Sequence, residues 1–595
     1  MTTEAQYQEL LLRHTHDAPH RNVLPSDCAA SRLIRPTFGL RTAALFLALF
    51  TLSAPSLSQA PSGQDMLIQE RQQKLLEEQQ RRLEELKRLP GDSQPQAPAQ
   101  PTEPSGCINI ERIQIEGADH LPEASQRELL TPFEAQCLDN SKLNELLGAI
   151  TKAYLDRGLI TSRAYLPPQD LSEGTLTIRV IEGRLESFES TGTPSQREIW
   201  MTFPGKVGEI LNVRELEQLL DQLGRLPSRT ATLDLLPGTQ PGMSKVDVKN
   251  DPQKSWRATV RFDNTGFKST GEHQMGATLT WDSPLGVADQ LSLSAARDTK
   301  LRHTLRSENQ SLTYSLPFGW WSFNYSASYN NYKSQTELFG INFENRGNSQ
   351  QHRLRIERLL HRDSLSKTSA ALGLAHLQAN NYFEDIKLDV SSYRLTELEL
   401  LLTHGRRIQN TYLNLEAGAQ RGIGELGAQR RGQPQGSDPN ARYKKYTLTL
   451  SALYPFTLGT ENFSFETVAY GQKSENALYS PQRIGLGGLN SVRGFKDQIL
   501  YGASGGYWRN QLRWRKASNL IPGLNNYSLA LAYDMGLIQR NKTQGDASEH
   551  LSGGGIELIT QGKYLSASLT YAHTLTRPKG WKREHPVYFS INMTY

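Results

Sequence analysis

The chain has 595 residues, too many for one ordinary domain, and carries a formal net charge of +5 at pH 7. Its mean hydropathy is −0.55, and it holds no run of about 18 apolar residues, which excludes a helical membrane protein. A transmembrane barrel fits this hydropathy, because half of each strand faces a polar lumen. The charge is spread along the chain without a clustered basic face, so no nucleic-acid partner is expected.

Residues 1–60 have the features of an extended secretory signal region. The apolar stretch 43–54 is too short to span a bilayer, follows three arginines within 32–41 and precedes small residues at 56–60. A short buried helix is the alternative interpretation of this stretch. Cys28 precedes the expected cleavage region and would be removed with it.

Residues 61–89 predict a polar helix, because they are rich in strong helix formers and lack Pro and Gly from residue 64 onward. Four acid–base pairs have the i,i+4 spacing that supports an isolated helix: Glu70–Lys74, Glu77–Arg81, Glu78–Arg82 and Glu84–Arg88. At about 1.5 Å per residue the helix would run about 40 Å, enough to thread a water-filled barrel lumen. A short coiled coil that dimerises is the alternative. Residues 90–106 are a Pro-rich linker that frees the helix to move.

Residues 107–183 and 184–250 repeat one order of elements, β-α-α-β-β. In the first unit we expect strands at 108–116, 160–166 and 175–181, and helices at 123–130 and 141–157. In the second we expect strands at 185–190, 230–236 and 244–248, and helices at 194–203 and 213–223. The order resembles that of POTRA domains; an unrelated pair of small α+β domains is the alternative.

Two cysteines, Cys107 and Cys137, remain after removal of the signal region. An even pair in an exported chain favours a disulfide. A zinc site would need more ligands than this pair offers, and no His cluster lies nearby in the sequence, so no metal is expected.

Residues 251–595 lose helical periodicity and show alternation typical of β-strands. The last segment is the clearest, with Val587, Phe589, Ile591, Met593 and Tyr595 alternating with Tyr588, Ser590, Asn592 and Thr594. A soluble sandwich would also alternate, but about 345 residues of it rich in Tyr and Trp favour a closed barrel. At about twenty residues per strand and loop, about sixteen strands fit. The predicted fold class is therefore mainly β, a transmembrane barrel preceded by a helix and two α+β domains.

The segment Gly487-Gly488-Leu489-Asn490-Ser491-Val492-Arg493-Gly494-Phe495 interrupts this pattern. It resembles the VRGF/Y signature of the outer-membrane assembly and secretion superfamily, in which an extracellular loop folds back into its own barrel. Further familiar motifs are Asp263-Asn264-Thr265-Gly266, Ser283-Pro284-Leu285-Gly286, Leu316-Pro317-Phe318-Gly319-Trp320-Trp321 and Ala532-Tyr533-Asp534-Met535-Gly536. Together these segments resemble the two-partner secretion transporters of the TpsB, or haemolysin-activator, family (ShlB/FhaC/HecB, with CdiB-like members).

The resemblance implies that the loop tip, Val492 to Phe495, reaches into the lumen, where Arg493 pairs with Asp534. A guanidinium binds a carboxylate with two parallel hydrogen bonds, so the pair would latch a long loop to the wall. Gly487, Gly488 and Gly494 would supply the tight or left-handed backbone of such a loop. The alternative is that the pair only holds the shape of the barrel.

The resemblance also implies the function: export of a large TpsA-type exoprotein, bound in extended form by periplasmic POTRA domains, through an outer-membrane barrel that contacts lipid and acts as a monomer. Strand addition would occur in the groove between the strand near 244–248 and the helix at 213–223. The helix 61–89 would leave the lumen when cargo docks. The cargo class stays open among haemolysins, adhesins and contact-dependent toxins.

Three other functions are alternatives to transport. A barrel-assembly factor of the same superfamily would typically carry more POTRA units and no lumen helix. A passive porin would need neither POTRA domains nor the Arg493 loop. An enzyme is not expected, because no Gly-x-Ser-x-Gly elbow or metal-type His pairing stands out and no Walker A sequence is present; no cofactor is expected either.

Overall fold

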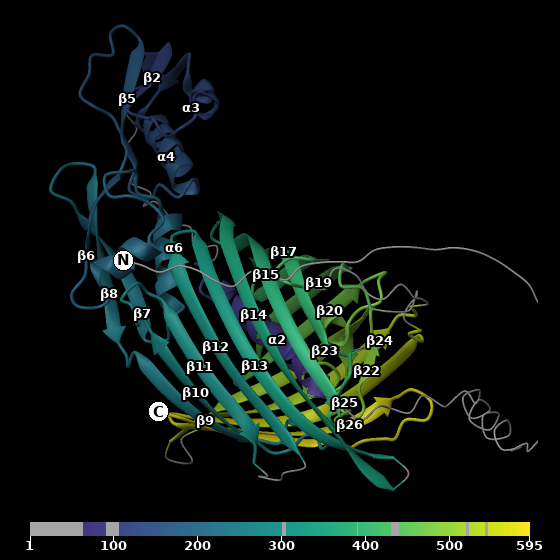
Figure 1. Ribbon diagram of the computed structural model, residues 1–595. Helices are drawn as coiled ribbons and strands as arrows, with labels where there is room; N and C mark the ends of the chain where they lie inside the picture. The colour runs from purple at the N-terminus through teal and green to yellow at the C-terminus, as the bar shows by residue number, and fades with distance from the viewer. Residues whose placement is uncertain are drawn as a thin grey trace, which may run out of the picture. The chain divides into compact units, whose positions relative to one another are not determined.

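The computed structural model describes residues 63–90, 106–299, 305–338, 340–389, 391–429, 439–518, 523–541 and 545–595. The expected signal region with Cys28, and most of the expected linker, lie outside the described residues. Within these ranges no helix is both long and apolar enough to cross a membrane. The chain forms one long helix, two small α+β units and a closed β-barrel, in that order (Figure 1).

The first α+β unit contains β1 (Ile108–Ile110), β2 (Arg112–Glu116), α3 (Glu123–Leu130), η1 (Thr131–Phe133), β3 (Gln136–Leu138), α4 (Asn140–Asp156), β4 (Arg163–Tyr165) and β5 (Thr175–Ile181). One face of α4 packs Leu146, Ile150 and Tyr154 against Leu176 and Ile178 of β5, all of them buried. This apolar contact between helix and sheet supplies the core of the unit.

The prediction of a single strand over residues 108–116 is wrong in one respect. It is broken at Glu111, so that β1 pairs with β3 and β2 pairs with β5. Alternation continues through the break because each half is extended, so the sequence pattern gave no sign of two different partners. The strand β3 was not expected at all, since three residues are too few to show a period.

The second α+β unit contains β6 (Arg184–Glu189), α5 (Gln196–Thr202), α6 (Val213–Gly224), β7 (Arg229–Pro237) and β8 (Met243–Pro252). Its sheet has the order β6-β8-β7. Helix α5 begins with a capping box, in which Ser195 Oγ accepts from the Glu198 amide and Glu198 accepts from the Ser195 amide. The helix therefore starts at Gln196 rather than at residue 194.

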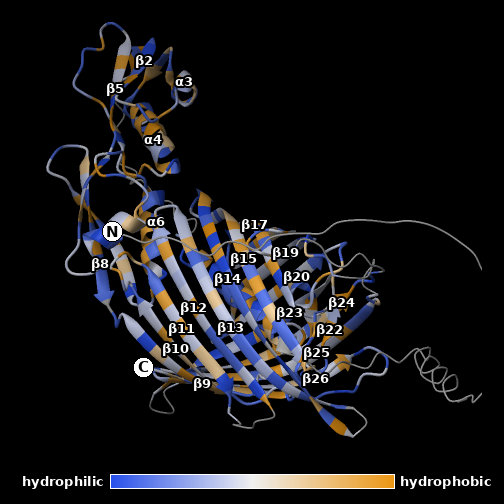
Figure 2. Cartoon of the chain, viewed as in Figure 1, coloured by the Kyte–Doolittle hydropathy of each residue, from blue (hydrophilic) through white to orange (hydrophobic). Residues whose placement is uncertain are grey.

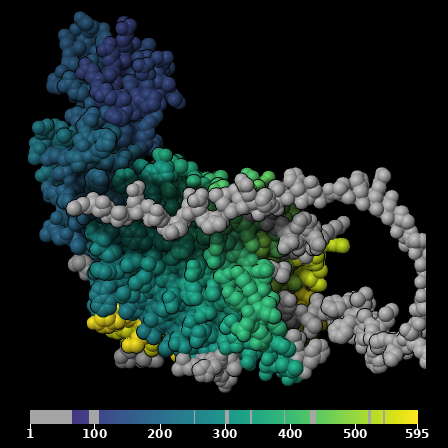
Figure 3. All heavy atoms as spheres, in the orientation of Figure 1, coloured from purple at the N-terminus to yellow at the C-terminus, as the bar shows by residue number. Residues whose placement is uncertain are grey.

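The barrel is a closed antiparallel ring of sixteen strands, as predicted. They are β9 (Trp256–Asp263), β10 (Gln274–Asp282), β11 (Gln290–Asp298), β12 (Arg306–Phe318), β13 (Trp321–Leu338), β14 (Ile341–Arg362), β15 (Ser366–Phe383), β17 (Tyr393–Ile408), β18 (Thr411–Ile423), β19 (Lys444–Leu458), β20 (Glu461–Lys473), β23 (Gly505–Ala517), β24 (Leu524–Ile538), β25 (Glu549–Gly562), β26 (Leu565–Thr576) and β27 (Val587–Thr594). Ring closure joins β27 to β9, with Ser590 opposite Asp263 and Thr594 opposite Thr259. The two-residue β16 (Ile386–Lys387) extends the edge of β15. Figure 3 shows the teal and green atoms of the barrel closely packed where its near face is visible.

Strand β17 illustrates why the wall has two chemically different faces. Leu398, Leu400 and Leu402 are exposed on one face, whereas Glu397 and Glu399 are buried on the other. Successive side chains of a strand point to opposite faces, so the leucines face outward and the glutamates face the lumen. Figure 2 shows hydrophobic and hydrophilic residues alternating along the barrel strands.

Helix α2 (Gly63–Lys87) lies inside the ring (Figure 1). It contacts β13, β17, β18 and β19 of the wall and η2 (Ser480–Gln482) of the loop that precedes β23. A helix that is polar on most sides is compatible with a lumen lined by polar side chains.

Candidate functional site

The loop between β20 and β23 folds inward and forms a small core of its own. It contains η2 and a two-stranded sheet of β21 (Ile484–Leu486) and β22 (Leu500–Gly502). The core side chains are fully or almost fully buried and come from the loop and the wall: Ile484, Leu486, Val492, Phe495, Tyr507, Ile538, Leu551 and Trp581. Apolar burial therefore holds the loop body, with Val492 and Phe495 as its anchors at the tip.

Arg493 and Asp534 form the polar contact at the loop tip. Asp534, on β24, accepts from the Arg493 backbone amide at 3.0 Å, from Nε at 2.7 Å and from Nη2 at 2.8 Å. Arg493 Nη1 also donates to Gln511 Oε1 at 2.8 Å. Arg493 is 2% exposed and Asp534 is 0% exposed. The two side chains thus make a buried, two-pronged ion pair between the loop and the wall.

Glycines make this approach possible. Gly494 has a φ of +105°, and a Cβ added there would lie 2.5 Å from the His573 carbonyl oxygen. Across the contact, a Cβ at Gly553 of β25 would lie 1.6 Å from the carbonyl oxygen of Arg493. Gly487 and Gly488 also have positive φ, as the loop requires. Gly553 was not singled out from the sequence, because nothing local to it marks the loop as its neighbour.

The connection between β26 and β27, with the start of β27, supplies further contacts that sequence reasoning missed. The Glu584 carboxylate accepts from the backbone amides of Lys496 and Asp497 at 2.6 and 3.1 Å. Trp581 packs edge-on against the Phe495 ring, with the ring centres 6.0 Å apart, and Tyr588 donates to the Phe495 carbonyl at 3.2 Å. These partners lie more than 80 residues from the tip, so no local sequence signal could have found them.

Helix α2 is held in the lumen by polar side chains. Gln79 Oε1 accepts from Asn414 of β18 and Ser451 of β19, each at 2.8 Å. Arg82 pairs with Glu357 of β14 at 2.6 Å. Each of these contacts joins the helix to the barrel wall without a covalent link.

The same helix is bonded to the inward loop. Arg71 donates to the carbonyls of Pro481 at 2.7 Å and Arg483 at 2.5 Å. Gln72 donates to the Gly485 carbonyl at 2.6 Å. Helix and loop therefore occupy the lumen together, and a movement of either breaks contacts of the other.

Two of the four predicted ion pairs along α2 form. Glu70–Lys74 and Glu78–Arg82 are present at 2.6 and 2.9 Å. The predicted pairs Glu77–Arg81 and Glu84–Arg88 are replaced: Arg81 pairs with Glu78 and Glu85, Glu84 pairs with Lys87, and Arg88 donates to the Gly224 carbonyl. Rotamer choices among several acids within reach decided these pairings, and spacing alone does not rank them.

A cavity of about 690 Å³ lies between α2, the wall and the C-terminal half of α6. Most of the residues that line it have polar or charged side chains, of both signs, including Arg353, Glu399 and Lys445 from the wall. Charged side chains of this kind are suited to contact with water.

Helix α6 is clamped to the turn between β14 and β15. Arg362 Nε pairs with Glu217 at 2.8 Å, and Asp221 binds both Arg362 and Lys367. Burial by itself would raise the pKa of the Asp221 carboxyl, but Lys367 and Arg362 outweigh it and hold that pKa below its ordinary value. The second α+β unit is thus tied to the wall by a partly buried charge network.

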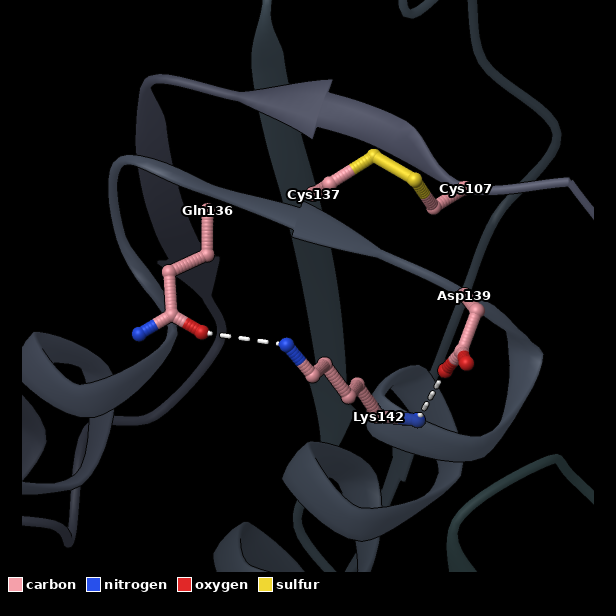
Figure 4. Close-up of a disulfide and its surroundings, with 5 residues drawn as sticks. All are labelled: Cys107, Gln136, Cys137, Asp139 and Lys142. Carbon is pink, nitrogen blue, oxygen red and sulfur yellow. Dashed lines mark hydrogen bonds between the residues drawn. A yellow bond between two sulfur atoms is a disulfide. The ribbon is translucent and has the colours of Figure 1, made fainter.

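The structure joins Cys107 and Cys137 in a disulfide (Figure 4). The bond spans 30 residues of sequence and links the start of β1 to β3. The chain then turns into α4, whose N-terminus is capped by Asp139 accepting from the Lys142 amide at 2.8 Å. The disulfide fixes the point at which the first unit begins.

The prediction that cargo adds as a strand beside residues 244–248 is wrong. These residues belong to β8, the central strand, which pairs with β6 on one side and β7 on the other. The outer edge of β6 is partly covered by backbone bonds between Leu185 and residues 208–209. Among the described residues, β7 has no strand on its outer side. The sequence showed which segments are strands but not their order in the sheet.

Comparison with known proteins assigns the family. Residues 242–560 match the family described as haemolysin secretion/activation protein ShlB/FhaC/HecB. Residues 108–183 match the ShlB-type POTRA domain, and 184–237 match a POTRA domain. The chain belongs to the haemolysin secretion/activation family. The two α+β units are its POTRA domains.

Relatives in this family agree over most of the chain. The outer membrane transporter CdiB of Dickeya dadantii (strain 3937) is 32% identical over 529 residues, 89% of this chain and 94% of that protein. The hemolysin transporter protein ShlB of Serratia marcescens is 32% identical over 507 residues, 84% of this chain and 89% of that protein. The solved structure of CdiB from Escherichia coli matches with a TM-score of 0.86 at 32% identity, covering 91% of this chain and all of that one.

As a family member, the chain is an outer-membrane transporter whose POTRA domains lie in the periplasm. The predicted fold of a barrel with an N-terminal helix and two POTRA domains is confirmed. No finding favours the assembly factor over the transporter.

Proposed function

We propose that this chain moves a large secreted exoprotein of the TpsA type through its barrel to the cell surface, acting as a monomer in outer-membrane lipid. The cargo would be a haemolysin, an adhesin or a contact-dependent toxin, as expected from the sequence. Haemolysin transport is named for the Serratia marcescens relative, and this likeness supports the same class of cargo here.

The observation that carries the proposal is the occupied lumen. A 25-residue helix and an inward loop occupy the lumen. The helix is held by hydrogen bonds and ion pairs that exchange readily with water, together with apolar contacts of Leu67, Leu83 and Leu86. A passive porin has no use for such an arrangement. A transporter needs it, because the barrel must stay closed at rest and open for an unfolded chain.

Cargo would dock in extended form at the outer edge of β7, because both edges of β8 are already paired. Ala231 and Leu233 of β7 pack against the POTRA core, and Leu235 continues the same face of the strand but is 41% exposed. An added strand would gain backbone hydrogen bonds from β7 and an apolar contact from Leu235. The cargo would then displace α2 by competing for the lumen.

Secretion of the partner exoprotein's N-terminal fragment tests the transporter. We expect the fragment in the medium with the wild-type protein, none after deletion, and a reduced amount with Arg493→Ala at an equal level of folded barrel. Arg515→Ala, which removes an exposed arginine of β23, is the matched control and should secrete normally. Unchanged secretion after deletion, with other outer-membrane barrels depleted, would promote the assembly factor. Loss of folded barrel in step with loss of secretion would leave Arg493 a purely structural role.

The docking edge has its own matched pair of variants. Leu235→Ser should weaken cross-linking of the cargo fragment to the POTRA domains, whereas Leu236→Ser should not, because Leu236 points to the opposite face of β7. Both leucines are similarly exposed, at 41% and 39%. Equal loss in the two variants would argue against docking on the Leu235 face.

Channel conductance tests the lumen helix. Gln79→Ala together with Arg82→Ala removes the hydrogen bonds and the ion pair that join these two side chains to β14, β18 and β19. The double variant should raise ion conductance in planar bilayers. Gln80→Ala, at an exposed position of the same helix, should leave conductance unchanged. If the double variant conducted like the wild type, the helix would not be the barrier.

A further inference from the structure

Helix α5 of the second POTRA domain exposes a tryptophan. Trp200 is 68% exposed, while its neighbours Glu198 and Ile199 are buried. Arg197, one helical turn earlier, is exposed on the same face. A single exposed apolar side chain is common on proteins, so the meaning of Trp200 depends on its surroundings.

The ring of Trp200 meets a residue of the lipid-facing wall. It packs edge-on against Phe318, with the ring centres 6.1 Å apart. Phe318 ends β12 on the same alternating face as Leu312, Tyr314 and Leu316, whereas Thr313 and Ser315 line the lumen. Phe318 is 47% exposed on that outer face, so the Trp200 ring adjoins the surface that lipid covers.

The contact is fixed by the backbone around it. The Gly319 amide donates to the Met201 carbonyl at 2.8 Å, and a Cβ at Gly319 would lie 3.0 Å from Pro204 Cα. Ala288, in the connection between β10 and β11, belongs to the buried core of the POTRA domain. Helix α5 is therefore seated on the periplasmic turns of the barrel, at the rim where the wall leaves the membrane.

Aromatic and basic side chains mark that rim as the bilayer boundary. Exposed aromatics at this end of the strands include Trp256, Trp281, Trp321 and Tyr595. Lys254 lies 3.6 Å from the centre of the Tyr595 ring, and Arg358 lies 5.0 Å from that of Trp321. Trp and Tyr concentrate at the lipid headgroup level of membrane proteins. Through Phe318, Trp200 is continuous with this belt.

We propose that Trp200 inserts into the headgroup region of the periplasmic leaflet, so that the second POTRA domain binds phospholipid as well as the barrel. The indole gains an apolar environment while its N–H stays near polar headgroups, and Arg197 lies beside it to meet phosphate. The contact fixes the tilt of α5 and thereby holds α6, with Asp221 and Arg225, at the mouth of the lumen.

Spin labelling tests the proposal on the full chain in nanodiscs of phosphatidylethanolamine and phosphatidylglycerol. A nitroxide is attached at Trp200→Cys, Phe318→Cys or Tyr165→Cys, each with Cys28→Ser. Tyr165 is 50% exposed and lies in the first POTRA domain. The ratio of oxygen to nickel-chelate accessibility at 200 should match that at 318 and exceed that at 165 several-fold.

A label at 200 that is as accessible to the nickel chelate as the label at 165 would overturn the proposal. So would a label that is shielded only when the cargo fragment is added, because Trp200 would then serve cargo docking. Should the cysteine variant fail to fold, brominated phospholipid gives the same answer with the native side chain. The fluorescence difference between wild type and Trp200→Phe should be quenched by that lipid, and an unquenched difference refutes insertion.

Discussion

Asp534→Ala is the most direct perturbation of the loop latch. It removes three hydrogen bonds from Arg493 and leaves a guanidinium that is 2% exposed with Gln511 and a more distant carbonyl of Asn510 as partners. Breaking a buried ion pair by removing one partner typically costs about 3–5 kcal/mol. Because Gln511 still accepts one hydrogen bond from Arg493, we expect the free energy of unfolding to fall by about 3 kcal/mol.

A double-mutant cycle separates this interaction from the loss of either side chain alone. Unfolding free energies in phospholipid bilayers are measured by denaturant titration for wild type, Arg493→Ala, Asp534→Ala and the double variant. If the two side chains act as a unit, the double variant is only slightly less stable to unfolding than either single variant. The coupling energy is then about 2–3 kcal/mol. Arg515→Ala should lie within about 0.5 kcal/mol of wild type.

A coupling energy below about 0.5 kcal/mol would refute a stabilising ion pair, since residues in direct contact and shielded from water should exceed that value. Apolar packing of Val492 and Phe495 would then be what holds the tip. Such a result would also remove the physical basis for a selective secretion defect of Arg493→Ala.

Three further predictions concern backbone fit, pH and the disulfide. Gly553→Ala should force the loop tip out of the lumen, because its Cβ would lie 1.6 Å from the Arg493 carbonyl oxygen. Residues 474–504 should then become accessible to protease at the cell surface. Gly554→Ala is the control and should have no such effect, because its Cβ would lie 3.4 Å from the nearest neighbouring atom. Burial, with the nearby Glu209 carboxylate, raises the pKa of Glu215 on α6 from 4.5 to about 7. The stability that the protonated Glu215 carboxyl gives to the POTRA domain is therefore full below pH 4.5 and is lost as the pH rises through 7. Hydrogen exchange of the α6 amides, corrected for intrinsic rates, should show about 1–2 kcal/mol less protection at high pH; this figure allows for the partial exposure of the Glu215 side chain to solvent. Glu215→Gln should abolish this dependence of protection on pH. Replacing Cys107 and Cys137 by alanine should destabilise the first POTRA domain by about 3–4 kcal/mol, from the chain entropy of its loop, and leave the barrel unchanged in pulse proteolysis.

The order of the main parts followed from local patterns. Alternation over more than half of the chain predicted a barrel, and the count of about sixteen strands is confirmed. Helix formers without Gly or Pro predicted the N-terminal helix, which spans Gly63–Lys87. These patterns have periods of two and of about 3.6 residues, so a short window of sequence is enough to express them.

The residues of the candidate site were identified from the sequence only where a motif marked them. Val492 to Phe495 and Asp534 came from resemblance, and the structure brings Arg493 and Asp534 together. Glu584, Trp581 and Gly553 carry no such mark, although they contact the same loop tip.

The tertiary structure alone decided which segments are neighbours. It placed β8 between β6 and β7, split residues 108–116 between two partners, and chose which acids pair along α2. It also set Trp200 beside Phe318 at the rim of the barrel. The physical reason is that periodicity fixes which face of a segment is apolar, whereas pairing depends on contacts between residues far apart in the chain, whose energies no local window contains.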